Sequence, residues 1–148
     1  MKNRIRNATV ADIEQLADLF DQYRVFYEKK SDKKAARAFL TARISNRESE
    51  IFIALHRGDI VGFVQLYPLF SSTRMKRLWL LNDLFVRPEF RGQGFSIDLI
   101  EKAKELCRNT NACGMFLETA KSNDVGNNLY PKTDFNRIED YNFYSWDV

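Results

Sequence analysis

A turn between a buried strand and a helix is the feature of this sequence that could do chemistry. Two glycines, Gly92 and Gly94, and the basic Arg91 follow an apolar run that ends at Val86, and helical periodicity begins after them. A helix start leaves backbone N–H groups unpaired at the positive end of the helix dipole, and glycine lets the backbone approach a ligand closely. The turn therefore predicts an anion site that suits a pyrophosphate. Two glycines alone are equally explained by a turn that only reverses the chain.

Two motifs around and beyond this turn narrow the choice. The run over 82–94 continues into Arg91-Gly92-Gln93-Gly94-Phe95-Ser96, and a second segment reads Asn123-Asp124-Val125-Gly126-Asn127-Asn128-Leu129-Tyr130. The first resembles the acetyl-CoA signature of the GCN5-related N-acetyltransferase (GNAT) family, Arg/Gln-x-x-Gly-x-Gly/Ala, with serine in the last small position. The second is similar to the family's Asn-x-x-Ala-x-x-Leu-Tyr, with glycine in the alanine position. The order and distance of the two motifs also fit the family.

The resemblance weakens after the second motif. The family usually continues Tyr-Glu-Lys-x-Gly-Phe, whereas this chain has Pro131 in place of the glutamate and Asp134 in place of the glycine. Pro131 is expected to distort the helix over 124–130 or to end it early. Aspartate tolerates a left-handed backbone better than most residues, so Asp134 is compatible with a position that usually holds glycine.

The resemblance implies how acetyl-CoA would be held as co-substrate, with no metal. Backbone N–H groups after Arg91 would bind the pyrophosphate, Arg91 would add positive charge, and the pantetheine arm would pair like a strand with the end of the central strand. The residues implied in this binding are Leu84, Phe85, Val86, Arg91, Gly92, Gln93, Gly94, Phe95, Ser96, Ile97 and Asn123. A backbone N–H at Leu84 or Phe85 would polarise the thioester carbonyl.

The resemblance also implies an acid and leaves the base open. Tyr130 matches the family's usual proton donor to the departing thiolate. Relatives that acetylate polyamines use a glutamate at the position of Asn82. The asparagine amide cannot act as a base. Asp83 is the neighbouring catalytic candidate, but in a regular strand its side chain points to the opposite sheet face, so abstraction through water is an alternative.

Three residues are candidates for recognising the acceptor amine. Glu28 and Tyr27 lie near the end of the first helix, and Tyr67 follows the strand that often lines the acceptor side in the family. A solvated glutamate and ordinary packing tyrosines explain the same residues. His56 lies beside a hairpin turn, away from both motifs, and is expected to be an ordinary surface residue.

Hydrophobic periodicity supplies the elements that position these residues. Thr9 with Asp12 three residues later is a helix-start signature. The sequence predicts an α/β (α+β layered) single domain over 1–148, with a mixed, mostly antiparallel sheet flanked by helices in the order β-α-α-β-β-β-α-β-α-β. The predicted ranges are strands at 5–8, 51–55, 60–69, 78–86, 114–118 and 141–148, and helices at 10–29, 32–47, 95–110 and 124–130.

Composition excludes several function classes. Apolar residues make up 45% of the 148 residues and charged residues 29%, as in folded globular domains. The net charge of +3 is spread along the chain and gives little support to nucleic-acid or membrane binding. Cys107 and Cys113 lack the spacing of a zinc site. No signal peptide or membrane span is recognised, so the cytoplasm is expected.

The sequence therefore predicts an acetyl-CoA-dependent N-acyltransferase that acetylates the amine of a small molecule, such as a polyamine or an amino acid. Two alternatives stay open. One is a catalytically silent acyl-CoA-binding or regulatory module, because Asn82 replaces a glutamate and Pro131 interrupts the second motif. The other is an enzyme that acetylates protein or peptide amines. A homodimer is a further expectation, with the aromatic segment 141–148 as a sheet edge.

Overall fold

The structure of the protein is a computed structural model that describes residues 4–148. These residues divide into two compact units, 4–117 and 118–148. The first unit contains β1 (Arg4–Asn7), η1 (Val10–Asp12), α1 (Ile13–Phe26), α2 (Lys33–Ser45), β2 (Glu50–His56), β3 (Asp59–Ser71), β4 (Lys76–Val86), η2 (Pro88–Phe90), α3 (Phe95–Asn109) and β5 (Met115–Phe116). The second unit contains α4 (Asp124–Lys132).

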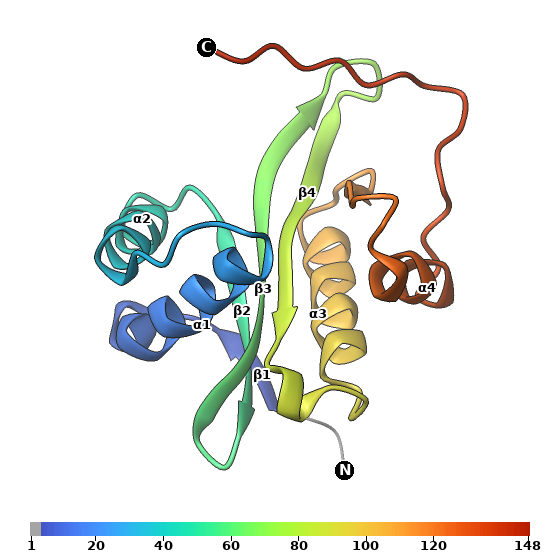
Figure 1. Cartoon of the computed structure of the whole chain (residues 1–148). Coiled ribbons are helices and arrows are strands. Elements are labelled where there is room, and N and C mark those ends of the chain that lie inside the picture. Colours follow the sequence, from blue (N-terminus) through green and yellow to red (C-terminus); the bar gives the residue numbers. More distant parts are fainter. Residues whose placement is uncertain (1–3) are drawn as a thin grey trace. The chain divides into compact units, whose positions relative to one another are not determined.

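The sheet of the first unit has the strand order β1-β2-β3-β4-β5. The first three pairings are antiparallel and the last, between β4 and β5, is parallel. This confirms the predicted mixed, mostly antiparallel sheet. Helices α1 and α2 lie on one face of the sheet and α3 lies on the other (Figure 1).

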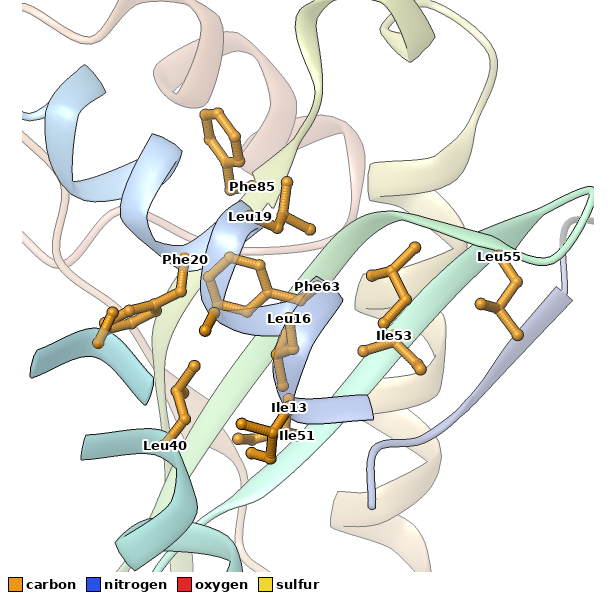
Figure 2. Close-up of a cluster of buried hydrophobic side chains, with 13 residues drawn as sticks. Ile13, Leu16, Leu19, Phe20, Leu40, Ile51, Ile53, Leu55, Phe63 and Phe85 are labelled. Carbon is orange, nitrogen blue, oxygen red and sulfur yellow. The ribbon is translucent and has the colours of Figure 1, made fainter. Parts of the chain in front are cut away.

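The largest core cluster fills the space between the sheet and helices α1 and α2 (Figure 2). Leu16 and Leu19 of α1, Leu40 of α2 and Phe63 of β3 are all completely buried. Their burial follows the apolar stripe of each helix. Because β3 and β4 are anchored by this cluster, the side chains that share its face are held against α1.

Local capping fixes the start of α1. The Thr9 side chain accepts from a backbone N–H, and the Asp12 side chain accepts from the Thr9 N–H at 2.8 Å, so the predicted helix start is confirmed. The helix over 10–29 begins as a 3₁₀ turn and ends at Phe26. Asp32 caps α2 by accepting from the Ala35 N–H at 3.0 Å.

The predicted closing strand over 141–148 is wrong. This segment has no regular structure, and its large apolar side chains are exposed, from 69% for Phe143 to 90% for Tyr144 among the rings. Alternating residues make a strand only where another strand accepts their backbone hydrogen bonds, and no strand lies in the described unit 118–148. The homodimer expected through this edge stays a prediction.

Two further boundaries differ from the expectation. The strand over 114–118 shortens to Met115–Phe116, and α4 continues past Pro131 to Lys132. A proline in the last turn removes one N–H donor, and the Thr133 hydroxyl closes that turn by donating to the carbonyls of Leu129 and Tyr130 at 3.2 and 3.0 Å.

Candidate functional site

The turn between β4 and α3 has the geometry of an anion site. Gly92 and Gly94 have φ angles of 75° and 87°, in the left-handed region that favours glycine. Gly94 is the N-cap residue of α3, and no side chain caps this helix start. The first N–H groups of α3, those of Phe95, Ser96 and Ile97, therefore lie where a helix lacks internal hydrogen-bond partners. Such a helix start suits a phosphate.

Arg91 ties this turn to the rest of the unit. Its Nε donates to the Val86 carbonyl at 3.0 Å. Its guanidinium carbon lies 5.4 Å from the ring centroid of Phe26 and 5.3 Å from that of Phe85. The resemblance assigned Arg91 a charge contribution at the pyrophosphate, and the structure adds a second task, which is to hold the turn against β4 and the end of α1.

The outer edge of β4 is open along its second half. Strand β5 pairs with β4 only at Trp79 and Leu80. From Leu81 to Val86, no other strand among residues 4–148 pairs with that edge, while β3 pairs with the opposite edge. The sequence-derived candidates Leu84, Phe85 and Val86 thus present backbone groups to which an extended ligand can add like a strand.

A β-bulge interrupts β4 just before these residues. Gln65 pairs with Asp83 and Leu66 with Leu81, so Asn82 is an extra residue. The expectation of a regular strand, with the side chains of Asn82 and Asp83 on opposite faces, is wrong. The Asn82 amide nitrogen instead donates to Asp83 Oδ1 at 3.1 Å. The bulge breaks the alternation and turns Asp83 toward α1.

Asp83 is a buried carboxylate with three neutral donors. The residue is 5% exposed, and besides Asn82 it accepts from Gln65 Nε2 at 2.8 Å and from the Tyr23 hydroxyl. Burial raises the pKa of Asp83, and these hydrogen bonds offset only part of the rise. Among residues 4–148, no arginine or lysine forms an ion pair with this carboxylate. A base with a raised pKa and no counter-charge suits a proton acceptor.

Gln65 is a functional candidate that sequence reasoning missed. It is completely buried, and its Oε1 accepts from the Ser49 hydroxyl at 2.8 Å, so its amide is fixed with the nitrogen toward Asp83. The available signal was a single polar residue inside the apolar run from Ile60 to Leu66. A buried amide needs hydrogen-bond partners, so its position in that run marks a polar site.

The acceptor candidates are placed differently from one another. Tyr67 lies two residues after Gln65 on β3, on the face of Asp83. Burial, followed by the negative charge of Asp83, raises the pKa of Tyr67 to about 12, while the positive charge of Arg43 acts in the opposite direction. Tyr27 reaches the site through Tyr23, since the two ring centroids are 5.1 Å apart.

Glu28 lies apart from this cluster of side chains. It is exposed just beyond α1, with a left-handed backbone at φ 63°. The exposed aromatic rings at this helix end are Phe26 and Tyr27, with ring centroids 5.3 Å apart. The structure therefore places aromatic rings, and not an acid, beside the chain of contacts that leads to Asp83.

His56 is not an isolated surface residue, contrary to expectation. It is half-buried, and its ring centroid lies 5.2 Å from that of Phe90 in η2 and 6.3 Å from that of Phe95, the first residue of α3. The hairpin end of β2 thus packs against the glycine turn. The sequence could not predict this contact, because residues 56 and 95 are far apart in the chain and come together only in the folded unit.

The second unit holds Asn123 and Tyr130. Asn123 caps α4 by accepting from the Gly126 N–H at 3.2 Å, and its amide donates to Thr119 Oγ1 at 2.9 Å. A Cβ on Gly126 would lie 2.6 Å from the Asn123 amide nitrogen, which explains glycine where the family has alanine. Tyr130 packs edge-on against Phe135 at 5.7 Å between ring centroids. Asp134 adopts φ 70°, which confirms its left-handed backbone.

Residues 4–148 meet neither the requirements of a metal centre nor those of a membrane-spanning helix. Within residues 4–148, no group of three or more histidine, cysteine or acidic side chains is arranged to hold a metal ion. None of the helices in that range has the length and apolar character required to cross a bilayer.

Comparisons with known proteins agree with this geometry. The model of the acetyltransferase (GNAT) family matches residues 13–135. The chain is 41% identical over 144 residues to an uncharacterised N-acetyltransferase, YhfO, of Bacillus subtilis (strain 168), and the match covers 97% of each chain. It is also similar to a crystal structure of a probable acetyltransferase, with 37% identity, a TM-score of 0.93 and coverage of 98% of this chain and 97% of that one.

A more distant solved structure shares the fold. The aminoglycoside acetyltransferase meta-AAC0020 from an uncultured soil metagenomic sample, in complex with trehalose, is 20% identical with a TM-score of 0.85. The match covers 99% of this chain and 96% of that one. At this identity the likeness concerns the fold alone.

Proposed function

The chain belongs to the acetyltransferase (GNAT) family of N-acetyltransferases, which use acetyl-CoA, and on this basis we propose that it acetylates the amine of a small molecule directly. The observation that carries the proposal is the position of Asp83. This buried carboxylate lies beside the bulge at which the open edge of β4 begins, and that edge leads to the glycine turn at Gly92. A co-substrate along the edge and a base on the adjacent face meet at this point.

The first unit supplies the acetyl-CoA contacts in this proposal. Amides of Gly92 to Ile97 bind the pyrophosphate, and Leu84 to Val86 pair with the pantetheine arm. The N–H of Leu84 or Phe85 donates to the thioester carbonyl and stabilises the negative charge that develops on its oxygen. Asn123 contributes by capping α4, because its side-chain oxygen and nitrogen are both engaged in hydrogen bonds within the second unit.

The chemical step balances without a covalent enzyme intermediate. The acceptor arrives as an ammonium ion and gives one proton to Asp83, directly or through water, and the neutral amine attacks the thioester carbonyl. The C–N bond forms, the C–S bond breaks, and the nitrogen loses a second proton. The thiolate leaves as CoA–SH with a proton from Tyr130. The second proton from the nitrogen passes through solvent and restores the Tyr130 phenol, and Asp83 releases the first proton to solvent. The net products are an acetamide, CoA–SH and one proton.

A small acceptor is favoured by the buried position of the base. Asp83 is only 5% exposed, Tyr23 donates to it, and the Tyr27 ring packs against Tyr23, so a compact amine suits it better than a folded protein surface. The fold likeness to an aminoglycoside acetyltransferase is compatible with this choice but does not select an acceptor.

Calorimetric titration with acetyl-CoA tests the binding half of the proposal. We expect saturable binding of about one molecule per chain. Gly92→Asp and Gly92→Asn form a matched pair, since both side chains tolerate a left-handed backbone and differ in charge. The aspartate variant should bind at least about 10-fold more weakly than the asparagine variant, because it opposes a pyrophosphate. Equal affinity in two folded variants would contradict the phosphate assignment.

Release of CoA thiol with a panel of amines tests the transfer half. Turnover with small amines supports the proposal. Tight acetyl-CoA binding without turnover on any amine would identify a catalytically silent module. Turnover with peptides alone would identify a protein N-acetyltransferase.

A further inference from the structure

A positively charged side chain faces the acceptor side from α2. The Arg43 guanidinium carbon lies 4.5 Å from the ring centroid of Phe39, and Nη2 donates to Glu48 Oε1 at 3.1 Å. Its Nε is buried and has no hydrogen-bond partner among the described residues. A guanidinium carries five N–H donors, so Arg43 is held in place while most of its donors remain unused by the protein.

The loop after α2 connects Arg43 to the base. Glu48, its ion-pair partner, directly precedes Ser49, whose hydroxyl donates to Gln65 Oε1 at 2.8 Å. The Gln65 amide nitrogen in turn donates to Asp83 at 2.8 Å. Arg43 on α2 and Asp83 on β4 are thus linked through the neighbouring loop residues Glu48 and Ser49 and through Gln65.

Tyr67 is within electrostatic reach of both charges. It is half-buried on β3, two residues after Gln65, and both the Asp83 carboxylate and the Arg43 guanidinium act electrostatically on its hydroxyl. The ion pair that Arg43 forms within the described chain is with Glu48 and not with Asp83. The first unit therefore holds a carboxylate and a guanidinium that both act on the same phenol.

We propose that the acceptor is an amino carboxylic acid, whose amine binds at Asp83 and whose carboxylate binds at Arg43, with the Tyr67 hydroxyl within electrostatic reach of both. This inference rests on the proposed function and names the substrate class of the same site. The ammonium of a zwitterion offsets the charge of Asp83, and its carboxylate can accept from the guanidinium donors of Arg43 that the pair with Glu48 leaves unused. A polyamine would bring a second positive charge toward Arg43, so the same arrangement disfavours it.

A series of acceptors tests the proposal. Glycine, β-alanine, 4-aminobutanoate and 6-aminohexanoate vary the distance between amine and carboxylate. The methyl ester of each removes the negative charge and adds one methyl group, and its effect on the pKa of the amine is smallest in the longer acids. In the parent protein, kcat/KM for one of these acids should exceed that for its ester by about 10- to 100-fold, the range expected for a hydrogen bond between charged groups. The preferred length reports the span between Asp83 and Arg43.

Variants on α2 separate recognition from structure. Arg43→Gln should lower kcat/KM for the acid to that for its ester, through KM, while leaving the ester unchanged. Arg43→Lys should keep part of the preference. Arg37→Gln is the matched control, because Arg37 is exposed on the same helix and pairs with Glu14. Its preference for acids should equal that of the parent.

The outcomes distinguish this inference from the proposed function. If esters and plain alkylamines match every acid in the parent, or if Arg43→Gln weakens acids and esters equally, the amino acid assignment is overturned while the acetyltransferase assignment stands. If no amine of any kind is acetylated by protein that binds acetyl-CoA, the proposed function fails, and the acceptor class fails with it.

Discussion

Replacing Asp83 with asparagine should abolish most of the activity and leave the fold intact. The change removes the buried carboxylate that we propose as the base and keeps nearly the same volume. General base catalysis contributes about 10²- to 10⁴-fold to rate, so kcat should fall by that factor, which corresponds to about 2.7–5.4 kcal/mol. In the proposed function the acetyl-CoA contacts are made by backbone groups of β4 and the glycine turn, so affinity for acetyl-CoA should not change.

The neighbours of Asp83 decide whether the asparagine is tolerated. Its new NH₂ group would face the donor Nε2 of Gln65, and an unrelieved clash of two buried donors would cost about 1–3 kcal/mol. The contact of Gln65 with Ser49 offers relief, since a hydroxyl can accept as well as donate. Rotation of the Gln65 amide by about 180° would reverse both hydrogen bonds and satisfy the new side chain.

The pH dependence of stability gives an independent test of the environment of Asp83. Because burial raises the pKa of Asp83 in the folded state, the folded protein holds this proton more tightly than the unfolded chain does. The carboxyl therefore destabilises the fold as the pH rises from the unfolded pKa, about 3.9, through the raised folded value. Between these two pKa values, each pH unit lowers the free energy of unfolding by about 1.4 kcal/mol. Asp83→Asn should thus gain in melting temperature relative to the parent between about pH 3 and pH 7.

Three measurements check the role of Asp83. Thiol release gives kcat, calorimetry gives the acetyl-CoA affinity, and thermal unfolding at about pH 3 and pH 7 gives the stability difference. Asp18→Asn is the control, since Asp18 is an exposed aspartate on α1 with a side chain 52% accessible. A folded Asp83→Asn protein with kcat within about threefold of the parent would refute the role of Asp83 as base, against the minimum loss of about 10²-fold expected.

Two further predictions concern the acid and the N-terminal cap. Tyr130→Phe should lower kcat by about 10²-fold and leave acetyl-CoA affinity unchanged, which single-turnover and binding assays can check; an unchanged kcat would exclude a rate-limiting role for this proton. The hydrogen bonds from Arg6 lower the pKa of Asp12 to about 2, and burial opposes them in part. Above about pH 4 this pair should stabilise the fold by about 1–2 kcal/mol, after allowance for the exposure of Arg6. The stabilisation should disappear as the pH falls through about 2. Asp12→Asn should therefore reduce the pH dependence of the unfolding free energy on the acid side, which thermal unfolding at a series of pH values can check.

The elements that sequence reasoning predicted well are those with local signals. The capping box at Thr9, the hairpin of β2 and β3 and the start of α3 after Gly94 each depend on neighbouring residues. Turn and cap preferences act over three or four positions, so a single sequence contains them. The family motifs supplied information beyond these local signals, because the resemblance implied the order of the strands and helices.

The site depends on features that no local signal encodes. A bulge exists only relative to a partner strand, so the run through Asn82 and Asp83 could not show which side chain turns inward. The same holds for His56, which meets Phe90 across the sheet. The strand prediction over 141–148 failed for the opposite reason. The residues alternate as in a strand, but the described unit 118–148 contains no partner strand.

In the proposed function, the bulge and the short β5 together allow β4 to serve two ligands. Because β5 stops pairing at Leu80, the backbone from Leu81 onward is open at one edge. Because Asn82 is the extra residue, the next side chain, Asp83, faces α1 instead of continuing the alternation of the preceding strand. A regular strand with a full-length neighbour would close the edge and reverse the carboxylate. Deleting Asn82 would remove the bulge but keep Leu81 opposite Leu66 and Asp83 opposite Gln65, so the face of Asp83 is set by its pairing with β3 and not by the Asn82 side chain.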